Sequence, residues 1–246
     1  MTELEPRARY TPPPWPDIFD FVDDVLAATS SDVVLPPSPI GMPFEIAFAA
    51  AARNRRLLAG VISLIRAGLP DVIGGLIRSI YETWLVGSYA LLGAPESLDR
   101  LLAHQDLHLK PILAVVGKES EEQGSQLQTR TLAEMTSQLM VQHGLPNPQY
   151  PLDAYEVVFR WESYRNTHGG LGAVEGYILR GDEGVTIIRA RQEGDDSVRH
   201  RVLVATAIFL SSTQIPAIEA GLDHSQLDSL ADRLFAFEPA HVVPDR

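Results

Sequence analysis

The segment DVIGGLIRSIYETWLVGSYALLG, residues 71–93, decides the fold because it is the most apolar stretch of the chain. Roughly twenty apolar residues are enough to cross a bilayer as a helix. Arg78 and Glu82 lie near the middle of the segment, however, and a charged residue at the bilayer centre costs at least ~2.5 kcal/mol. A helix that is apolar on nearly every side is also typical of the centre of a soluble bundle. We therefore predict that this segment is the core helix of a protein with no membrane association.

Further segments on both sides of this helix are also predicted to be helical. Their apolar residues recur at helical spacing, and prolines or glycines separate one segment from the next. Ser97 and Asp153 are expected N-caps, and Pro111 is expected to end or kink its helix. The predicted ranges are 17–28, 44–69, 97–117, 118–144, 153–168, 195–222 and 225–237, of which 118–144 is polar enough to lie on the surface.

One short segment departs from the helical pattern. YILRGDEGVTIIRA, residues 177–190, places two β-prone runs on either side of GDEG, a sequence suited to a hairpin turn. The predicted fold class is therefore all-α: a multi-helix bundle with one small β-hairpin near residues 176–190.

Length and composition indicate how the chain is divided. Its 246 residues are enough for one large domain. We assign a Pro-rich flexible arm to residues 1–16, a single helical domain to 17–238 and a tail to 239–246. The absence of cysteine excludes disulfides and thiolate chemistry. The N-terminus lacks the basic and apolar regions of a secretory signal, so we expect a cytoplasmic protein.

The charge balance bears on possible partners. Thirty-two acidic and twenty basic side chains give a formal charge of −12, which works against non-specific attraction to nucleic acid or anionic lipid. The local basic run RNRR, residues 53–56, either forms a phosphate-binding strip or lies on the solvated face of its helix. The sequence contains no glycine-rich phosphate loop, GxSxG elbow or nucleotide fingerprint, and it does not identify a cofactor.

Two predicted helices each carry an arginine and a glutamate four residues apart. Arg78 and Glu82 lie on one face of the core helix and can pair there. Glu156 and Arg160 repeat this relation on a later helix. Tyr155 lies near the start of that later helix. The face that carries Glu156 and Arg160 continues through Ser163 and Thr167. His168 lies at the C-terminal end of the same helix.

Packing of these two helices would bring Arg78, Glu82, Arg160, Ser163 and His168 to one pocket. An imidazole among carboxylates and guanidinium groups can serve general acid–base catalysis or anion binding. The alternative for Arg78 and Glu82 is a buried ion pair that fixes helix register. The alternative for His168 is a helix-end histidine that satisfies backbone carbonyls.

A second constellation contains two histidines. HQDLH places His104 and His108 at a spacing used for zinc. Gln105 occupies the position of the metalloprotease general base, and two histidines alone leave a metal site incomplete. The pair is therefore a weak metal candidate, and we favour a solvated pair of side chains.

The pairing of LIRSIYETW, residues 76–84, with YEVVFRWESYRNTHGG, residues 155–170, resembles an uncharacterised group of bacterial all-α proteins, a domain of unknown function. In that group an Arg-x3-Glu helix is followed much later by a Tyr-rich helix ending in Ser-x4-His-Gly. The resemblance covers roughly residues 45–220. The matching positions are Arg78, Glu82, Tyr155, Arg160, Ser163 and His168.

Such proteins are also somewhat similar to HEPN domains, whose ribonuclease members use Arg-x4–6-His on one helix. This chain departs from that motif, because seven residues separate Arg160 from His168 and two separate Arg165 from His168. The departure and the acidic charge argue against a ribonuclease.

Three functions follow from these observations. The first is an acid–base enzyme or binder acting on a small anionic molecule. In it Arg78 and Arg160 are anion anchors, Tyr155 is a further substrate contact, and Glu82 and His168 form the acid–base pair, with Ser163 as a hydrogen-bond partner. The second is a HEPN-like ribonuclease of a toxin or defence system. The third is a non-catalytic interaction protein. The arginine-studded, alanine-rich helix and the hairpin also offer surfaces for a homodimer.

Overall fold

The computed structural model describes residues 12–32, 41–115, 127–160, 178–180, 186–188 and 196–237; for 106–115, 160 and the two short 178–180 and 186–188 segments it describes the backbone alone. In these ranges eight α-helices pack together, which confirms the predicted all-α bundle. The α-helices are α1 (Trp15–Ala28), α2 (Gly41–Arg66), α3 (Gly74–Leu92), α4 (Glu96–Val115), α5 (Thr129–Gln142), α6 (Tyr150–Ala154), α8 (Asp196–Glu219) and α9 (Ser225–Phe237). A 3-10 turn, η1 (Pro70–Val72), precedes α3, and a π-helix, η2 (Tyr155–Arg160), continues α6.

Two three-residue strands fall within the range predicted for a hairpin. β1 (Ile178–Arg180) pairs antiparallel with β2 (Thr186–Ile188), so that Ile178 lies opposite Ile188 and Arg180 opposite Thr186. The residues that join the strands, 181–185, lie outside the described part of the chain.

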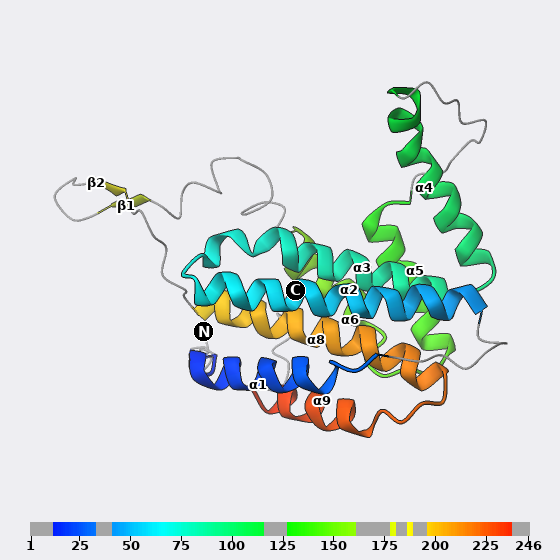
Figure 1. Cartoon of the computed structure of the whole chain (residues 1–246). Helices are drawn as coiled ribbons and strands as arrows, with labels where there is room; N and C mark the ends of the chain where they lie inside the picture. The colour runs from blue at the N-terminus through cyan, green and yellow to red at the C-terminus, as the bar shows by residue number, and fades with distance from the viewer. Residues whose placement is uncertain are drawn as a thin grey trace, which may run out of the picture.

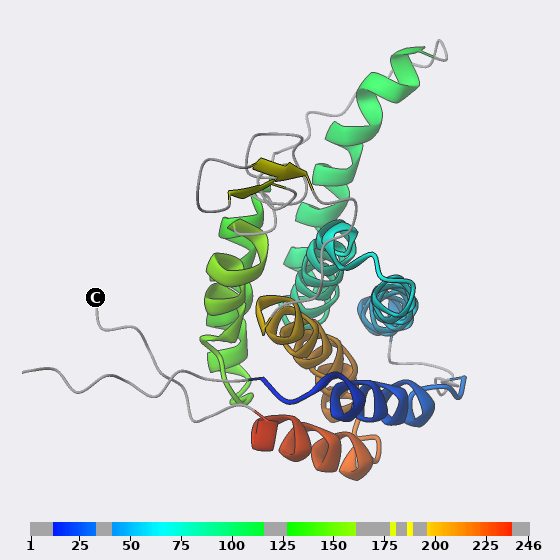
Figure 2. The ribbon, with the colours of Figure 1, turned by 90° about the vertical axis from the view of Figure 1, so that its left-hand side faces the viewer.

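The helices are arranged around α3 and α8. α2, α3 and α8 lie side by side with similar axis directions (Figure 1). α1 and α9 pack on α8, whereas α5, α6 and η2 lie on another side of α3 (Figure 2). α3 contacts α2, α4, α5, α8 and η2, which gives it the central position predicted for the most apolar segment.

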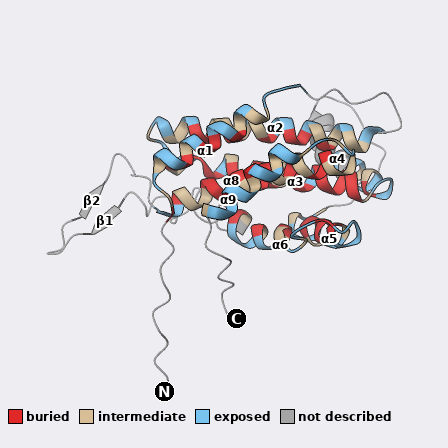
Figure 3. Cartoon of the chain, turned by 90° about the horizontal axis from the view of Figure 1, so that it is seen from below, coloured by how far each residue is buried: buried red, intermediate tan, exposed pale blue. Residues whose placement is uncertain are grey.

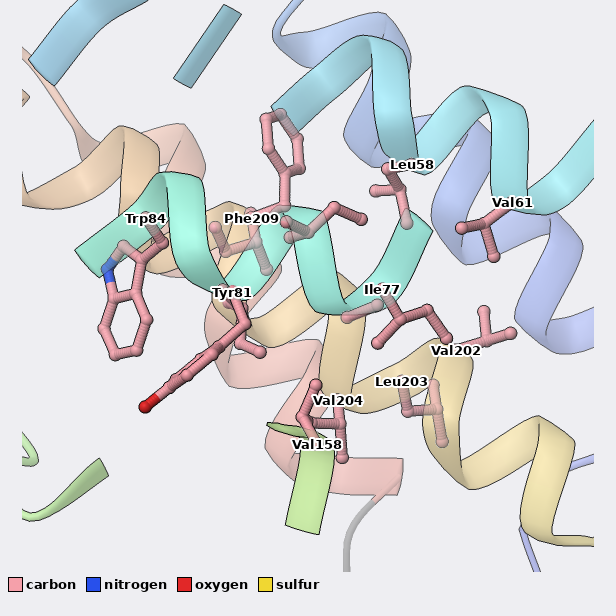
Figure 4. Packing of buried hydrophobic residues seen from close by; sticks show 14 of the residues in the cluster. Leu58, Val61, Ile77, Tyr81, Trp84, Val158, Val202, Leu203, Val204 and Phe209 are labelled. Atoms are coloured by element: carbon pink, nitrogen blue, oxygen red, sulfur yellow. The ribbon is translucent and has the colours of Figure 1, made fainter. Parts of the chain in front are cut away.

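The core follows from the composition of these central helices. Twelve of the nineteen residues of α3 are buried, and so are thirteen of the twenty-four of α8. Figure 3 shows the buried residues concentrated on these two helices and the exposed ones on the outer faces of α2 and α9. Ile77 of α3 packs between side chains of α2 and α8, whereas Tyr81 and Trp84 point away from α2 (Figure 4) and contact α6. Burying a side chain of this size contributes about 1.5–3 kcal/mol relative to leaving it exposed.

The contact between α2 and α3 is unusually close at one point. Gly87 of α3 faces Ala47 and Ala50 of α2, and a Cβ atom added to this glycine would lie 2.7 Å from the Cβ of Ala50. The alanine-rich sequence of α2 therefore lets two helix backbones approach each other, because both sides of the contact lack bulky side chains.

Several helix ends differ from the sequence-based prediction. α1 begins at Trp15 rather than Asp17, and α6 begins at Tyr150 rather than at an Asp153 cap. The reason is the same in both helices: Pro16 and Pro151 occupy the first turn, where proline has the required φ and its missing N–H costs nothing. The arm assigned to residues 1–16 therefore ends earlier than predicted.

The last residues before α1 are held to the bundle. The Arg199 Nη1 atom of α8 donates hydrogen bonds to the carbonyl oxygens of Pro12 and Pro13, at 2.9 and 2.8 Å. Prolines leave their carbonyl groups available as acceptors, so the Pro-rich sequence suits this contact. At its C-terminal end, the predicted arm is thus attached to α8 rather than flexible.

Three further predictions about the helices are corrected. Ser97 lies inside α4, and its hydroxyl donates to the Ala90 carbonyl at 3.2 Å instead of capping N–H groups. α4 also continues past Pro111 to Val115, so this proline does not end the helix, and the alternative of a kink there stays a prediction. α5 buries five residues, including Leu132 and Met140, so the stretch predicted to lie on the surface has one face in the core.

Among the described helices, α8 rather than α3 is long and apolar enough to cross a membrane. This follows from length and composition alone, which a core helix also satisfies. In the most apolar window of α8, 67% of the residues are buried inside the protein. Apolar residues are distributed around the whole circumference of α8. This matches its position, because helices contact it on several sides.

Asn54 is a polar residue in this apolar core. Its side chain is fully buried on α2, and in the described part of the chain neither amide atom has a hydrogen-bond partner. Leaving a polar group buried and unpaired costs about 1–3 kcal/mol, and leucine has a similar shape and a higher helix propensity. We expect Asn54→Leu to raise the free energy of unfolding by about 1 kcal/mol or more, measured by urea denaturation.

The matched control is Thr206→Val, because Thr206 is equally buried but its hydroxyl donates to the Val202 carbonyl at 2.8 Å. This control should leave stability unchanged or lower it. A loss of stability in Asn54→Leu would mean that the amide makes interactions that leucine cannot replace.

Candidate functional site

The predicted pair on the core helix is formed, and it is partly exposed. Arg78 Nε lies 3.1 Å from Glu82 Oε1, and the side chains are 24% and 39% exposed. A pair with this exposure contributes at most about 1 kcal/mol to stability. Neither side chain is fully buried, so the pair differs from the fully buried ion pair of the alternative, and its role in helix register stays a prediction.

An aromatic residue of η2 brings the second predicted helix against this pair. The Cζ atom of Arg78 lies 4.2 Å from the centre of the Phe159 ring, and Phe159 stacks on Tyr155 with ring centres 5.2 Å apart. A guanidinium group over an aromatic ring gains about 0.5–1 kcal/mol at an exposed site. The packing of α3 against η2 thus places Arg78, Glu82 and Tyr155 in one cluster, which we call the α3–η2 cluster.

Tyr81 of α3 connects this cluster to α6. Its side chain is fully buried, and its hydroxyl donates to the Pro151 carbonyl at 2.8 Å. Burial is the main cause that raises the pKa of the Tyr81 hydroxyl, and the nearby Tyr155 and Glu82 raise that pKa further. The neutral tyrosine therefore fixes the start of α6, and hence η2, against α3.

This anchor leads to a prediction for Tyr81→Phe. The substitution removes one of the two hydrogen bonds to the Pro151 carbonyl, which still accepts the backbone N–H of Tyr155, so we expect a loss of about 0.5–1.5 kcal/mol of stability at neutral pH. The pH dependence should also change. Because the folded protein raises the pKa of Tyr81, the stabilisation from its protonated form is complete below about pH 10 and declines as pH rises above that value.

Urea denaturation between neutral pH and pH 11 tests both effects. The unsubstituted protein should lose up to about 1 kcal/mol more per pH unit above pH 10 than Tyr81→Phe does. Parallel pH profiles for the two proteins would contradict a raised pKa of Tyr81, since the remaining tyrosines are common to both.

The segment after α6 is a π-helix rather than the α-helix expected from its sequence. Tyr155–Arg160 has the wider turn of this helix type, which is rare and occurs frequently at functional sites. The stack of Tyr155 on Phe159 lies within it. The predicted α-helical relation of Glu156 to Arg160 therefore does not describe this segment.

The structure describes the positions of some of the predicted site residues. Arg78, Glu82 and Tyr155 lie together in the α3–η2 cluster. Arg160 ends η2, but its side chain lies outside the described residues, as do Ser163 and His168. Their convergence with Arg78 and Glu82 remains a prediction.

The two candidate metal ligands do not form a described metal site. The Nδ1 atom of His104 accepts a hydrogen bond from the Leu127 backbone N–H at 3.0 Å, which connects α4 to the residues before α5. The side chain of His108 lies outside the described residues. Where side chains are described, no group of three or more histidine, aspartate or glutamate residues could hold a metal ion. His104 is thus a structural acceptor rather than a solvated side chain.

A cavity that no sequence motif predicts lies elsewhere in the molecule. It has a volume of about 430 Å³ and shares no lining residue with the α3–η2 cluster. Arg55 and Arg56 line it, so the RNRR run is the signal in the sequence that points toward it. Because the other walls come from α8 and from the residues that follow α1, spacing along one helix could not predict the cavity.

Comparison with protein-family models, curated proteins and solved structures finds no match to this chain. Its class is therefore defined by the fold and the cluster alone: an all-α bundle with an arginine–glutamate pair stacked on an aromatic π-helix. The resemblance to a bacterial domain family and to HEPN domains stays a prediction from sequence.

Proposed function

We propose that the α3–η2 cluster is one half of a site that binds a small anionic molecule. The observation that carries this proposal is the position of the Arg78 guanidinium, stacked on Phe159 and paired through Nε with Glu82. A guanidinium held in one orientation pre-organises its donors for a carboxylate or phosphate, so less entropy is lost on binding.

The other half of the proposed site comes from the residues that follow η2. Arg160 supplies a second cation, Tyr155 an aromatic contact, and Ser163 a hydrogen-bond partner. Glu82 and His168 then form the acid–base pair, with the partly exposed carboxylate of Glu82 able to accept a proton from a bound molecule. This arrangement supports acid–base chemistry on a small anion, or binding of that anion without reaction.

A thermal-shift screen against phosphorylated metabolites, nucleotides and divalent metals tests the proposal. A ligand present at a hundred times its Kd stabilises the folded state by about 3 kcal/mol. For a chain of this length, that corresponds to a rise in Tm of roughly 5–10 °C. We expect an anion among the phosphorylated compounds to produce such a rise.

The decisive comparison is Arg78→Gln against Arg130→Gln. Arg130 forms the same i,i+4 pair with Glu134 at 3.1 Å on α5, and it is 64% exposed. Arg78→Gln should abolish the ligand-induced shift, and Arg130→Gln should preserve it. Equal shifts in both variants would refute the assignment of Arg78 as an anion anchor.

His168→Ala and Glu82→Gln separate the remaining possibilities. If the protein is an enzyme, both variants should retain ligand binding and lose turnover of the ligand found in the screen. Slow growth on expression that His168→Ala relieves would instead indicate the ribonuclease. Loss of stability alone in Glu82→Gln, with no ligand found, would indicate an interaction protein.

A further inference from the structure

The cavity of about 430 Å³ lies between the end of α1, the middle of α2 and α8. Its volume falls within the roughly 300–1,000 Å³ of small-molecule sites. One part of its wall is apolar and the other is polar, an arrangement common in ligand pockets. The apolar part consists of Phe48, Ala49, Ala51, Ala52 and Phe209, and the polar part of Thr29, Ser30, Ser31, Asp32, Arg55, Arg56 and Thr213.

The polar wall is partly fixed by the end of α1. Arg55 donates to the Leu26 carbonyl through Nε at 3.2 Å and Nη2 at 2.8 Å. The hydroxyls of Thr29 and Ser30 donate to the carbonyls of Val25 and Ala27 at 2.8 and 2.7 Å. The Arg55 guanidinium thus pairs a carbonyl at the C-terminal end of α1 and reduces the negative potential there. The two hydroxyls add second donors to carbonyls that already accept the backbone N–H groups of Thr29 and Ser30.

Of the two arginines in the polar wall, Arg56 is the one whose guanidinium can contact a ligand. It is exposed, and within the described ranges it forms no hydrogen bond or ion pair. Two guanidinium groups and the single carboxylate of Asp32 leave this wall with one net positive charge. In a chain of net charge −12, such a local charge acts over about 8 Å at physiological ionic strength.

We propose that this cavity binds a small amphipathic organic acid with one negative charge. Its carboxylate would contact Arg56, and its apolar body would lie against Phe48, Phe209 and the alanines. The cavity has roughly the volume of fourteen water molecules and is open to solvent on one side, so it suits a ligand with a single ring or a short chain. Asp32 disfavours a second negative charge, so a monoanion is preferred to a phosphate dianion.

Isothermal titration calorimetry with 4-phenylbutyrate tests this proposal on the full chain. Acetate supplies the charge without the apolar body, and 4-phenyl-1-butanol supplies the body without the charge. We expect 4-phenylbutyrate to bind at least about tenfold more tightly than either. It exceeds the alcohol by a hydrogen bond to a charged group, and it exceeds acetate by the apolar surface that it buries. No binding up to about 10 mM, or equal binding of the alcohol, would overturn the proposal.

Two variants with the same change in charge locate the site. Arg56→Gln should weaken 4-phenylbutyrate binding by about tenfold or more. Arg53→Gln should leave it unchanged, because Arg53 is exposed on the same helix but does not line the cavity. Equal losses in the two variants would show a diffuse effect of charge and overturn the assignment. Ala52→Phe, which fills the cavity, should abolish binding, and unchanged affinity in that variant would also contradict the site.

Discussion

Replacing Trp84 by alanine should lower the free energy of unfolding by about 3–5 kcal/mol. The indole ring is fully buried at the centre of α3, with Tyr150 and Tyr81 ring centres at 5.6 and 6.1 Å. Removing it creates a cavity between α3 and α6, and the loss of stability includes the cost of that cavity as well as the lost apolar burial. Thermal unfolding should show Tm lowered by roughly 6–20 °C.

Trp15→Ala is the matched control for this experiment. Trp15 is partly exposed in the first turn of α1 and stacks on Phe19 of the same helix at 5.2 Å. Its removal takes less apolar surface out of the core, so we expect a loss smaller than that of Trp84→Ala by about 2 kcal/mol. Equal losses would contradict the central position of α3 in the core.

Gly87→Ala should destabilise the protein by about 1–3 kcal/mol, although alanine is the better helix former. The added Cβ would lie 2.7 Å from the Cβ of Ala50 and 3.4 Å from the Cα of Ala47. Carbon atoms pack at about 3.5–4.0 Å, so α2 and α3 would have to separate. Because this is the most extensive helix contact in the described structure, the cost of separation exceeds the gain of less than ~1 kcal/mol in helix propensity.

Gly75→Ala on the same helix is expected to raise the stability of the protein rather than lower it. A Cβ at Gly75 has nothing within 4 Å, so only the change in propensity remains, and stability should rise by up to about 1 kcal/mol. Chemical denaturation of both variants gives the comparison directly. If Gly87→Ala were as stable as Gly75→Ala, the close approach of α2 and α3 would be excluded.

The fold was predictable where one segment has a strong local signal. Residues 71–93 are apolar on nearly every side, and a helix with that composition must be covered by others, so its central position follows from the sequence. Helix ends were less predictable. Pro16 and Pro151 were interpreted as belonging to loops, yet a proline in the first turn is compatible with a helix. Pro111 shows the same limit within α4.

The π-helix could not be predicted from the residues of its own segment. Its wider turn coincides with the stacking of Tyr155 and Phe159 and with the contact of Phe159 to Arg78 on α3. Such packing depends on a residue about eighty positions earlier in the chain. Periodicity within one segment contains no information about that contact.

The candidate site was predictable in part for the same reason. A spacing of four residues places Arg78 and Glu82 on one helical face, and the structure forms that pair. The sequence could not indicate that the pair would be partly exposed, because exposure depends on which helices cover α3. The cavity with Arg56 was missed, since its walls come from α2, α8 and the residues that follow α1.

The central claim is that the α3–η2 cluster and His168 belong to one site, and a paramagnetic NMR measurement tests it most directly. The chain has no cysteine, so Ser79→Cys on α3 offers a single position for a nitroxide label, one turn from Glu82. We expect strong broadening of the His168 imidazole signals, relative to the same sample with a reduced label. Broadening of the Phe159 ring signals, close to Arg78, verifies that the label reports on the cluster. Unbroadened His168 signals in that sample would contradict the account.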